Sequence, residues 1–231
     1  MPFYYRFFIA CTIACTIVVI SGCATNIPKQ SAATSAALAL WQQQKLNNST
    51  MSSWEIKGKI GVKTGDQGGS ATLKWSYRND RQEIELYGPF GGGRIKISVT
   101  GDAAILKDTK GAVIEGESAA QVLYQRLGWR VPFAELIMWC RGLPDDHATD
   151  IVIDQYGRLK SLNQGVWHIE YQEYRSVAGF TLPRKLTLAS LPGGMALYDD
   201  HGKYIGDQLR VKVILRRWSA INPPGNRNYL P

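Results

Sequence analysis

The histidines and two of the serines are the side chains that could carry acid–base or nucleophilic chemistry. His147 and His201 each follow a pair of aspartates, at 145–146 and 199–200, in segments predicted to be turns. Aspartate favours turns because its carboxylate accepts hydrogen bonds from nearby backbone amides, so these groups indicate turns and not catalytic sites. His168 alternates with apolar residues on a predicted strand and is expected to face solvent.

Two segments, 68–72 and 116–120, are similar to the nucleophile elbow of serine hydrolases, but both lack its final glycine and its strand-to-helix context. The sequence contains no His-x₂₋₄-His or Cys-x₂-Cys spacing typical of metal sites. The Gly-Lys pairs at 58–59 and 202–203 are followed by Ile60 and Tyr204, not by the Ser or Thr of a P-loop. We therefore expect no catalytic residues, no enzyme activity, no metal and no cofactor.

Cys23 has more informative surroundings, because it follows Ile20, Ser21 and Gly22 after an apolar stretch that spans residues 7–20. This stretch is shorter than the about 20 residues that cross a bilayer, which indicates the core of a signal peptide. The four residues resemble a bacterial lipobox, in which the leader is cut off before a cysteine that carries acyl chains. We predict a leader over 1–22 and a lipidated Cys23. An uncleaved anchor and a cut elsewhere are the alternatives.

The remaining cysteines and the charge agree with export. Cys11 and Cys15 leave with the leader, so Cys140 has no partner for an intrachain disulfide and is expected to be a buried, small apolar residue. The net charge of +8 becomes +8 − 1 = +7 once Arg6 is removed. A basic surface suits anionic lipid, nucleic acid or acidic proteins. Since an exported protein seldom meets nucleic acid, lipid or a protein partner is favoured.

Residues 23–35 are small and polar and predict a flexible tether, and 36–47 are predicted to be a helix. Apolar and polar residues then alternate with a period of two, which is typical of antiparallel strands with one dry face. Strong alternation covers 54–62, 71–75, 83–86, 94–99, 167–171, 185–188 and 209–213, and weaker strands are predicted near 103–107, 111–115, 157–163 and 195–199. Two helices are predicted in between, at 118–127 with Ser118 as N-cap and at 132–141 with Pro132 in the first turn.

These elements predict a mainly β (α+β) fold, an unclosed antiparallel barrel of about eleven strands over residues 36–221, with a loose tail at 222–231. A dry face this large has to be covered, and more than eight strands leave room inside a barrel. The interior is therefore either an apolar cavity under a helical lid or plug, or a core filled by its own side chains. The predicted lining consists of Trp54, Ile56, Leu73, Trp75, Ile84, Leu86, Ile95, Ile97, Leu136, Trp139, Trp167, Ile169, Leu186, Val211 and Val213.

Several motifs, in order along nearly the whole mature chain, resemble the LolB family of outer-membrane lipoprotein acceptors. They are the lipobox, Trp-x₃-Gly at 54–58, Leu-x-Trp at 73–75, Gly-Pro-Phe-Gly at 88–91, and the helix motif that runs from Pro132 through Leu-x₂-Trp-x₂-Gly-Leu-Pro to 144. The resemblance implies an unclosed eleven-stranded barrel with a helical lid over an apolar cavity. It also implies that lipoproteins are received from the periplasmic carrier LolA and delivered into the outer membrane.

The resemblance further implies a membrane-insertion loop formed by Pro89, Phe90 and Gly91. The family usually has leucine at the apolar position, and here it is Phe90, which is bulkier but still apolar. A turn residue that is tucked in is the alternative. Ala24 follows the cysteine, where aspartate would favour the inner membrane, so the resemblance implies an anchor at the periplasmic face of the outer membrane.

The partners that follow are a LolA-type carrier, the acyl chains of client lipoproteins and outer-membrane phospholipid, with no nucleic acid and with a monomeric state. Two other functions are compatible with the sequence: a structural envelope lipoprotein that serves as a docking scaffold, and a lipid-modifying hydrolase. Basic residues on outward strand positions, such as Lys59 and Arg210, either keep the sheet soluble or dock an acidic partner or lipid phosphate.

Overall fold

The computed structural model describes residues 34–65, 67–88, 93–194, 196–198, 204–206 and 208–219. The predicted leader, the lipidation site Cys23 and the loop residues Pro89, Phe90 and Gly91 lie outside the described residues, as does the tail from 222 onward. The predictions made for these segments, and the domain boundaries that depend on them, therefore remain predictions.

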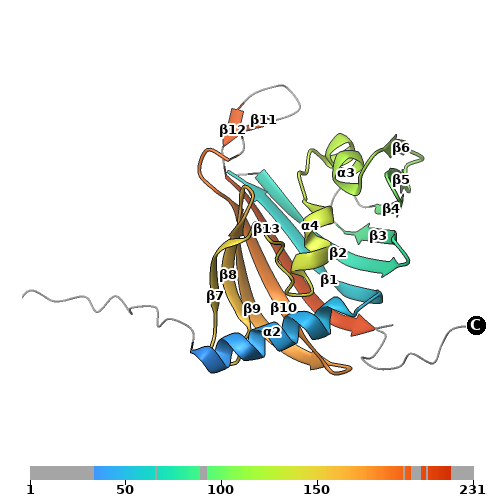
Figure 1. Ribbon diagram of the computed structural model, residues 1–231. Helices are drawn as coiled ribbons and strands as arrows, with labels where there is room; N and C mark the ends of the chain where they lie inside the picture. The colour runs from blue at the N-terminus through green and yellow to red at the C-terminus, as the bar shows by residue number, and fades with distance from the viewer. Residues whose placement is uncertain are drawn as a thin grey trace, which may run out of the picture. The chain divides into compact units, whose positions relative to one another are not determined.

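Eleven antiparallel strands form one sheet, in the order β6-β5-β4-β3-β2-β1-β13-β10-β9-β8-β7 (Figure 1). The strands are β1 (Ser53–Thr64), β2 (Gln67–Arg78), β3 (Arg81–Tyr87), β4 (Arg94–Thr100), β5 (Ala103–Asp108), β6 (Val113–Gly116), β7 (Thr149–Ile153), β8 (Leu159–Gln164), β9 (Trp167–Val177), β10 (Phe180–Ser190) and β13 (Leu209–Ser219). β1 and β13, the first and last of the described strands, pair in the middle of the sheet. The mainly β, unclosed architecture predicted from the sequence is confirmed.

The period-two pattern forms this sheet because it places every second side chain on the same face. In β1 the even-numbered residues from Trp54 to Val62 are buried and the odd-numbered ones are partly or fully exposed. β13 alternates in the same way from Leu209 to Leu215, with its odd-numbered residues buried. The buried face collects the apolar side chains on the concave side of the sheet, where burial stabilises the fold by about 25 cal/mol per Å² of apolar surface.

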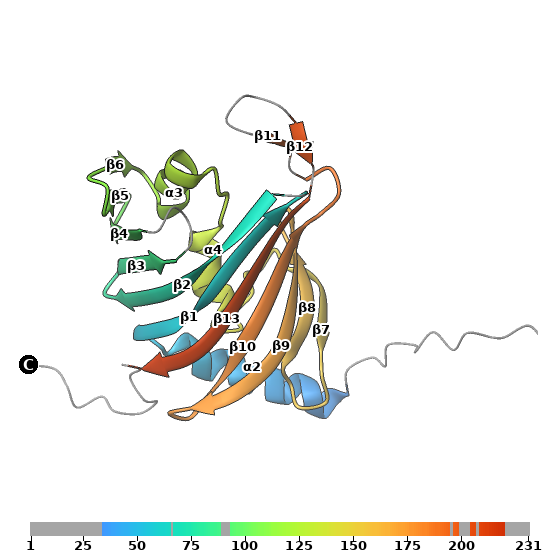
Figure 2. The same cartoon turned by 180° about the vertical axis from the view of Figure 1, so that it is seen from behind.

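Three helices lie on the concave side, and the view from behind shows the opposite face of the sheet without a helix over it (Figures 1 and 2). α2 spans Ser35–Ser49, with Thr34 as N-cap. α3 spans Ala119–Leu127, where the predicted N-cap Ser118 accepts a hydrogen bond from the Gln121 amide and Gly128 ends the helix in the left-handed conformation. α4 spans Phe133–Trp139 and is shorter than predicted. Among the described helices, none has the length and apolar character that crossing a bilayer requires.

The strand count is right, but one member differs from the prediction. The segment near 195–199 contributes β11 (Leu197–Tyr198), which pairs with β12 (Tyr204–Gly206) in a separate two-stranded sheet. The eleventh strand of the main sheet is β7, which was not predicted. Its residues do not alternate in burial, because Asp150 has a positive φ of 50° and the pairing with β8 shifts register twice. The sequence of an edge strand with such irregularities shows no alternation of apolar and polar residues from which the strand could be predicted.

Candidate functional site

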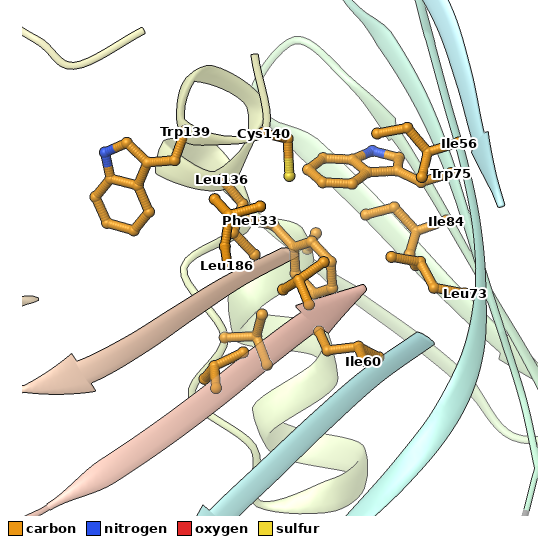
Figure 3. Packing of buried hydrophobic residues seen from close by; sticks show 14 of the residues in the cluster. Ile56, Ile60, Leu73, Trp75, Ile84, Phe133, Leu136, Trp139, Cys140 and Leu186 are labelled. Atoms are coloured by element: carbon orange, nitrogen blue, oxygen red, sulfur yellow. The ribbon is translucent and has the colours of Figure 1, made fainter. Parts of the chain in front are cut away.

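The concave side of the sheet holds one buried apolar cluster, and all fifteen residues predicted to line the interior belong to it. Each of them is at most 6 % exposed. They come from both halves of the sheet and from α4, and Figure 3 shows Ile56, Trp75 and Ile84 on one side of the cluster and Leu136 and Leu186 on the other. The sequence pattern therefore identified fifteen of the side chains that meet on this face.

α4 occupies the concave side of the sheet as a plug. Phe133, Leu136 and Trp139 on its inner face are buried, as is Cys140 at its end, and the Phe133 ring meets Trp75 edge to face at 5.5 Å. Side chains this fully enclosed contact other protein atoms on every side. In this conformation the plug fills the space next to the predicted lining, so a lining role for the fifteen residues requires α4 to move and stays a prediction.

An aromatic group at one end of the cluster surrounds Trp54. Its ring lies 5.0 Å from Trp75 and 5.7 Å from Trp218, both in edge-on arrangements, and it stacks on Tyr77 at 5.6 Å. Sequence reasoning found Trp54 and Trp75 but missed Trp218. The strand pattern hides Trp218, because a bulge opposite Lys57 and Gly58 inserts Arg216 and shifts the inward positions of β13 by one.

A small group of buried hydrogen bonds, which we call a polar joint, connects the end of α4 to the end of α2. The Arg141 guanidinium donates to the Met51 carbonyl at 3.1 Å and to the Ile137 carbonyl at 3.1 Å. In return, the Asn48 amide donates to the carbonyls of Arg141, at 2.8 Å, and of Thr181, at 3.0 Å. Burial lowers the pKa of Arg141, and no carboxylate among the described residues lies within ion-pair distance of it.

A second joint connects Trp139, the last residue of α4, and Asp145, in the segment after α4, to β8 through Gln164. Its side-chain oxygen accepts from Trp139 Nε1 at 2.9 Å and from the Asp145 amide at 3.2 Å, and its side-chain nitrogen donates to the Asp145 carboxylate at 2.8 Å. Sequence reasoning missed both joints, because the partners lie far apart along the chain and no local motif connects them. Together they hold the plug by a small number of specific hydrogen bonds.

Two glycines bracket the plug. Gly128 and Gly142 have φ values of 68° and 71°, a conformation that side chains with a Cβ rarely adopt. α4 has no side-chain hydrogen bond at its N-cap, where Pro132 stands. Burial raises the pKa of Cys140 to about 12, which keeps its thiol protonated and unreactive while α4 is in place. The plug is thus a short helix between two permissive backbone positions, with a protected thiol at its end.

The side chains that could do acid–base chemistry occupy structural roles. The His147 amide donates to the Asp145 carboxylate in a turn, as expected from the Asp-rich sequence. His168 is partly exposed and lies 2.6 Å from the Asn163 side-chain oxygen through Nδ1. His201 lies outside the described part of the chain, in which three or more His, Cys, Asp and Glu side chains nowhere gather as a metal site would require.

Most of the chain matches a known protein family. The family model described as outer membrane lipoprotein LolB matches residues 52–218. This chain belongs to the LolB family. An outer-membrane lipoprotein LolB from Stutzerimonas stutzeri is 31 % identical and covers 88 % of this chain and 92 % of its own. One from Pseudomonas syringae pv. syringae is 32 % identical and covers 87 % and 91 %.

Two solved structures are distantly similar. A LolA superfamily protein from Nitrosomonas europaea has 11 % sequence identity and a TM-score of 0.47, and covers 86 % of this chain and 96 % of its own. A putative outer membrane lipoprotein-sorting protein domain from Vibrio parahaemolyticus has 8 % identity and a TM-score of 0.46, and covers 84 % and 93 %.

Proposed function

We propose that this LolB family member is anchored through Cys23 at the periplasmic face of the outer membrane and serves lipoprotein localisation. It takes lipoproteins from a LolA-type carrier by direct, mouth-to-mouth transfer of their acyl chains and inserts them into the outer membrane. The observation that carries the proposal is the apolar concave face of an unclosed sheet, covered by a short helix that two small polar joints hold in place.

The energetics of acyl chains favour such a device over release into water. Each buried methylene is worth about 0.8 kcal/mol, so three chains with roughly forty methylenes would cost on the order of tens of kcal/mol to expose. When α4 moves aside, its apolar face can exchange contacts with the sheet for contacts with the acyl chains. The apolar surface exposed to water then changes little. The free-energy cost of moving α4 is therefore mainly the loss of the hydrogen bonds in the two polar joints.

The direction of transfer follows from relative affinity. The interior has to bind acyl chains more tightly than the carrier does and less tightly than the bilayer does, and such an ordering requires no nucleotide. The loop of Pro89, Phe90 and Gly91 would contact the membrane and favour release of the cargo there. A monomer is sufficient for all of these steps.

The opening of α4 can be measured through Cys140. In the mature, lipidated protein this is the remaining thiol, and we expect slow alkylation by iodoacetamide at pH 8 without cargo. A triacylated lipopeptide should accelerate alkylation at least tenfold, because cargo that displaces α4 exposes the thiol. A non-acylated peptide of the same sequence is the control. Equal rates with both peptides, under conditions where the lipopeptide binds, would refute the displacement of α4.

The transfer itself is tested by mixing purified carrier loaded with a lipoprotein with the acceptor in liposomes, without any energy source. Appearance of the lipoprotein in the liposome fraction supports the function. Retention on the carrier, with the acceptor correctly folded and anchored, would contradict it.

A further inference from the structure

The convex face of the sheet carries a concentration of unpaired positive charge that the proposed transfer does not use. We call this surface the basic face and define it by outward residues of β1, β10 and β13: Lys59, Lys63, Lys185, Arg210, Lys212 and Arg217. These three strands are neighbours in the sheet, and Figure 2 shows them side by side with no helix in front of them. In the described part of the chain, no carboxylate lies within ion-pair distance of these six residues.

The register places like charges directly opposite one another. Lys63 faces Arg210 across the β1–β13 pair, and Lys57, next to the basic face, lies between Arg217 on β13 and Lys74 on β2. Like charges at such positions destabilise a sheet. A sheet whose role were only to stay soluble could intersperse carboxylates to relieve this repulsion, as the neighbouring strands do.

The strands on the β3 side show that contrast. There Glu85 pairs with Arg94 at 2.6 Å and Glu83 pairs with Lys96 at 2.9 Å, so basic residues are matched by acidic ones. On β1 the one acidic outward residue is Glu55, which lies 3.6 Å from Lys57. The basic face therefore lacks the acidic partners that Arg94 and Lys96 have on the neighbouring strands.

One end of the basic face is hollowed. A recess of about 330 Å³ is lined by Lys63 and Arg210, together with Gly65, Ala189, Gly206, Gln208 and Leu209. It combines two cationic side chains, the amide of Gln208 and the apolar groups of Ala189 and Leu209. These groups match a phosphate-bearing headgroup and the first carbons that follow it.

We propose that the basic face binds the anionic phospholipid surface of the membrane, with a headgroup phosphate in the recess between Lys63 and Arg210. The inference goes beyond acyl transfer and rests on the membrane anchor proposed at Cys23. Basic side chains near an anionic bilayer each contribute attraction, and a lipid anchor combined with a polybasic patch holds a protein on a membrane more firmly than one signal alone. The basic face would set the orientation of the sheet on the bilayer to which the lipidated Cys23 anchors the protein.

The make-up of the face favours lipid over an acidic protein. Stable protein interfaces centre on buried aromatic and other apolar anchors. No large apolar side chain of the described outward positions on β1, β10 and β13 is exposed. Four of the six charges are lysines, whose compact ammonium groups on flexible stems need no fixed partner geometry and so suit a laterally mobile lipid surface. Single-stranded nucleic acid would need aromatic stacking platforms, which these positions also lack.

The test uses the full-length, lipidated protein with acylation of Cys23 verified by mass. It is reconstituted in neutral phosphatidylcholine vesicles or in vesicles with added phosphatidylglycerol. A water-soluble acetylating reagent modifies exposed lysines, and mass spectrometry gives the rate at each lysine. We expect acetylation of Lys59, Lys63 and Lys212 to slow about fivefold or more in anionic vesicles, and the effect to vanish in 0.5 M salt. Lys45 on α2 and Lys110 in the β5–β6 turn should keep their rates.

A charge-reversed variant, Lys63→Glu with Arg210→Glu, should lose the protection of Lys59 and Lys212. The matched control, Lys45→Glu with Lys110→Glu, should keep it. Equal rates in both vesicle types would overturn the proposal. A second result would also overturn it: soluble polyglutamate slows acetylation of these lysines in neutral vesicles, but anionic vesicles do not. That result would assign the face to an acidic protein. Protection by inorganic phosphate alone would assign the recess to a free anion and also overturn it.

Discussion

Asn48 and Arg141 form the most consequential side-chain pair of the described structure. Each residue satisfies a buried carbonyl of the other's helix end, and Asn48 is 3 % exposed and Arg141 8 % exposed. Their bonds connect α2, which begins just after the predicted tether, to the plug over the apolar interior. The pair therefore holds the end of α2 and the end of α4 together.

Replacing Asn48 with alanine should lower the free energy of unfolding by about 2 kcal/mol, because the buried carbonyl of Arg141 and the partly buried carbonyl of Thr181 lose this donor. Urea denaturation measures the change. Asn47→Ala is the matched control on the same helix, since the Asn47 amide donates to the Gly179 carbonyl in an exposed position and its loss should cost well under about 1 kcal/mol. A cost for Asn48→Ala no larger than that of the control would contradict the joint.

Phe90→Glu tests the predicted insertion loop. A charged side chain is unfavourable in the hydrocarbon region of a bilayer, so this variant should bind lipopeptide with unchanged affinity and fail to insert it into liposomes. Phe90→Leu, which restores the side chain usual in the family, should insert cargo normally. Normal insertion by Phe90→Glu would exclude the membrane-contact role of this residue.

At this scale the sequence predicted the apolar residues well and the polar ones poorly. Thirteen of the fifteen interior residues lie on strands and could be read from alternation, because burial on one face of a strand leaves a period of two. Asn48 directly follows the helix predicted over 36–47, and Arg141 follows a tryptophan and a cysteine, without any sign that the two are partners. Hydrogen bonds between residues 93 positions apart depend on the finished fold and leave no local pattern.

Among the elements, β1 is the one whose geometry is most tightly constrained. A Cβ on Gly58 would overlap the Ile214 carbonyl oxygen of β13, at the point where the register of the two strands shifts. The glycine of the Trp-x₃-Gly motif is therefore required by the close approach of two backbones. The bulge that it permits also turns Trp218 inward toward Trp54.

Gly58→Ala should destabilise the protein by about 3 kcal/mol or more, because two backbones have to separate to admit the methyl group. Gly61→Ala on the same strand is the matched control, since its Cβ would lie 3.7 Å from the Gly69 carbonyl oxygen, an ordinary contact. Its effect should remain within about 1 kcal/mol in either direction. Thermal unfolding of the two variants measures both effects, and equal destabilisation by Gly58→Ala and Gly61→Ala would contradict the close approach at Gly58.

α3 is fastened to the sheet by Asp108, whose carboxylate pairs with Arg126 at 2.6 Å. The amide of Ala112, the Arg126 side chain and the amide of Lys110 lower the pKa of Asp108 below its ordinary value of 3.8. The folded state thus favours the ionised carboxylate. The resulting stability is present above the pKa of the unfolded chain and is lost as the pH falls through the lower pKa of the folded protein.

The free energy of unfolding should therefore decrease as the pH drops below about 4. Asp108→Asn should flatten this decrease, because an amide cannot take up the proton. Asp102→Asn, in the exposed turn before β5, is the control for the loss of one carboxylate. An acid limb of the same slope in Asp108→Asn and in the unmodified protein would show that this group does not contribute.

Element boundaries were predictable where side-chain chemistry marks them. Ser118 and Gly128 bracket α3 as their cap preferences indicate. Prolines and glycines also marked α4, but it is shorter than the range of 132–141, since Pro132 is the N-cap and not the first helical residue. β7 was not predicted, because Asp150 and two register shifts remove the period-two pattern from its sequence. The segment at 195–199 does alternate, but its strand pairs outside the main sheet.

At the scale of the whole molecule, the two faces of the sheet are suited to different parts of one lipid. The concave face holds the apolar residues proposed to meet acyl chains, and the convex face holds the cations proposed to meet headgroups. One layer of backbone separates them, because neighbouring residues of a strand point to opposite sides. Reversal of charge on the basic face should therefore change the orientation on the membrane without altering affinity for a lipopeptide, which fluorescence titration can measure.

The strand order also bears on how an exported chain reaches this fold. β1 to β6 can form successive hairpins as soon as they emerge, and β7 to β10 can do the same later, but β1 has its second neighbour only when β13 arrives. Until then, β1 and β10 each present an open strand edge, next to an apolar face, to the crowded space outside the membrane. Because β13 pairs with both β1 and β10, a chain that lacks β13 would form two half-sheets without the strand that unites them into one sheet.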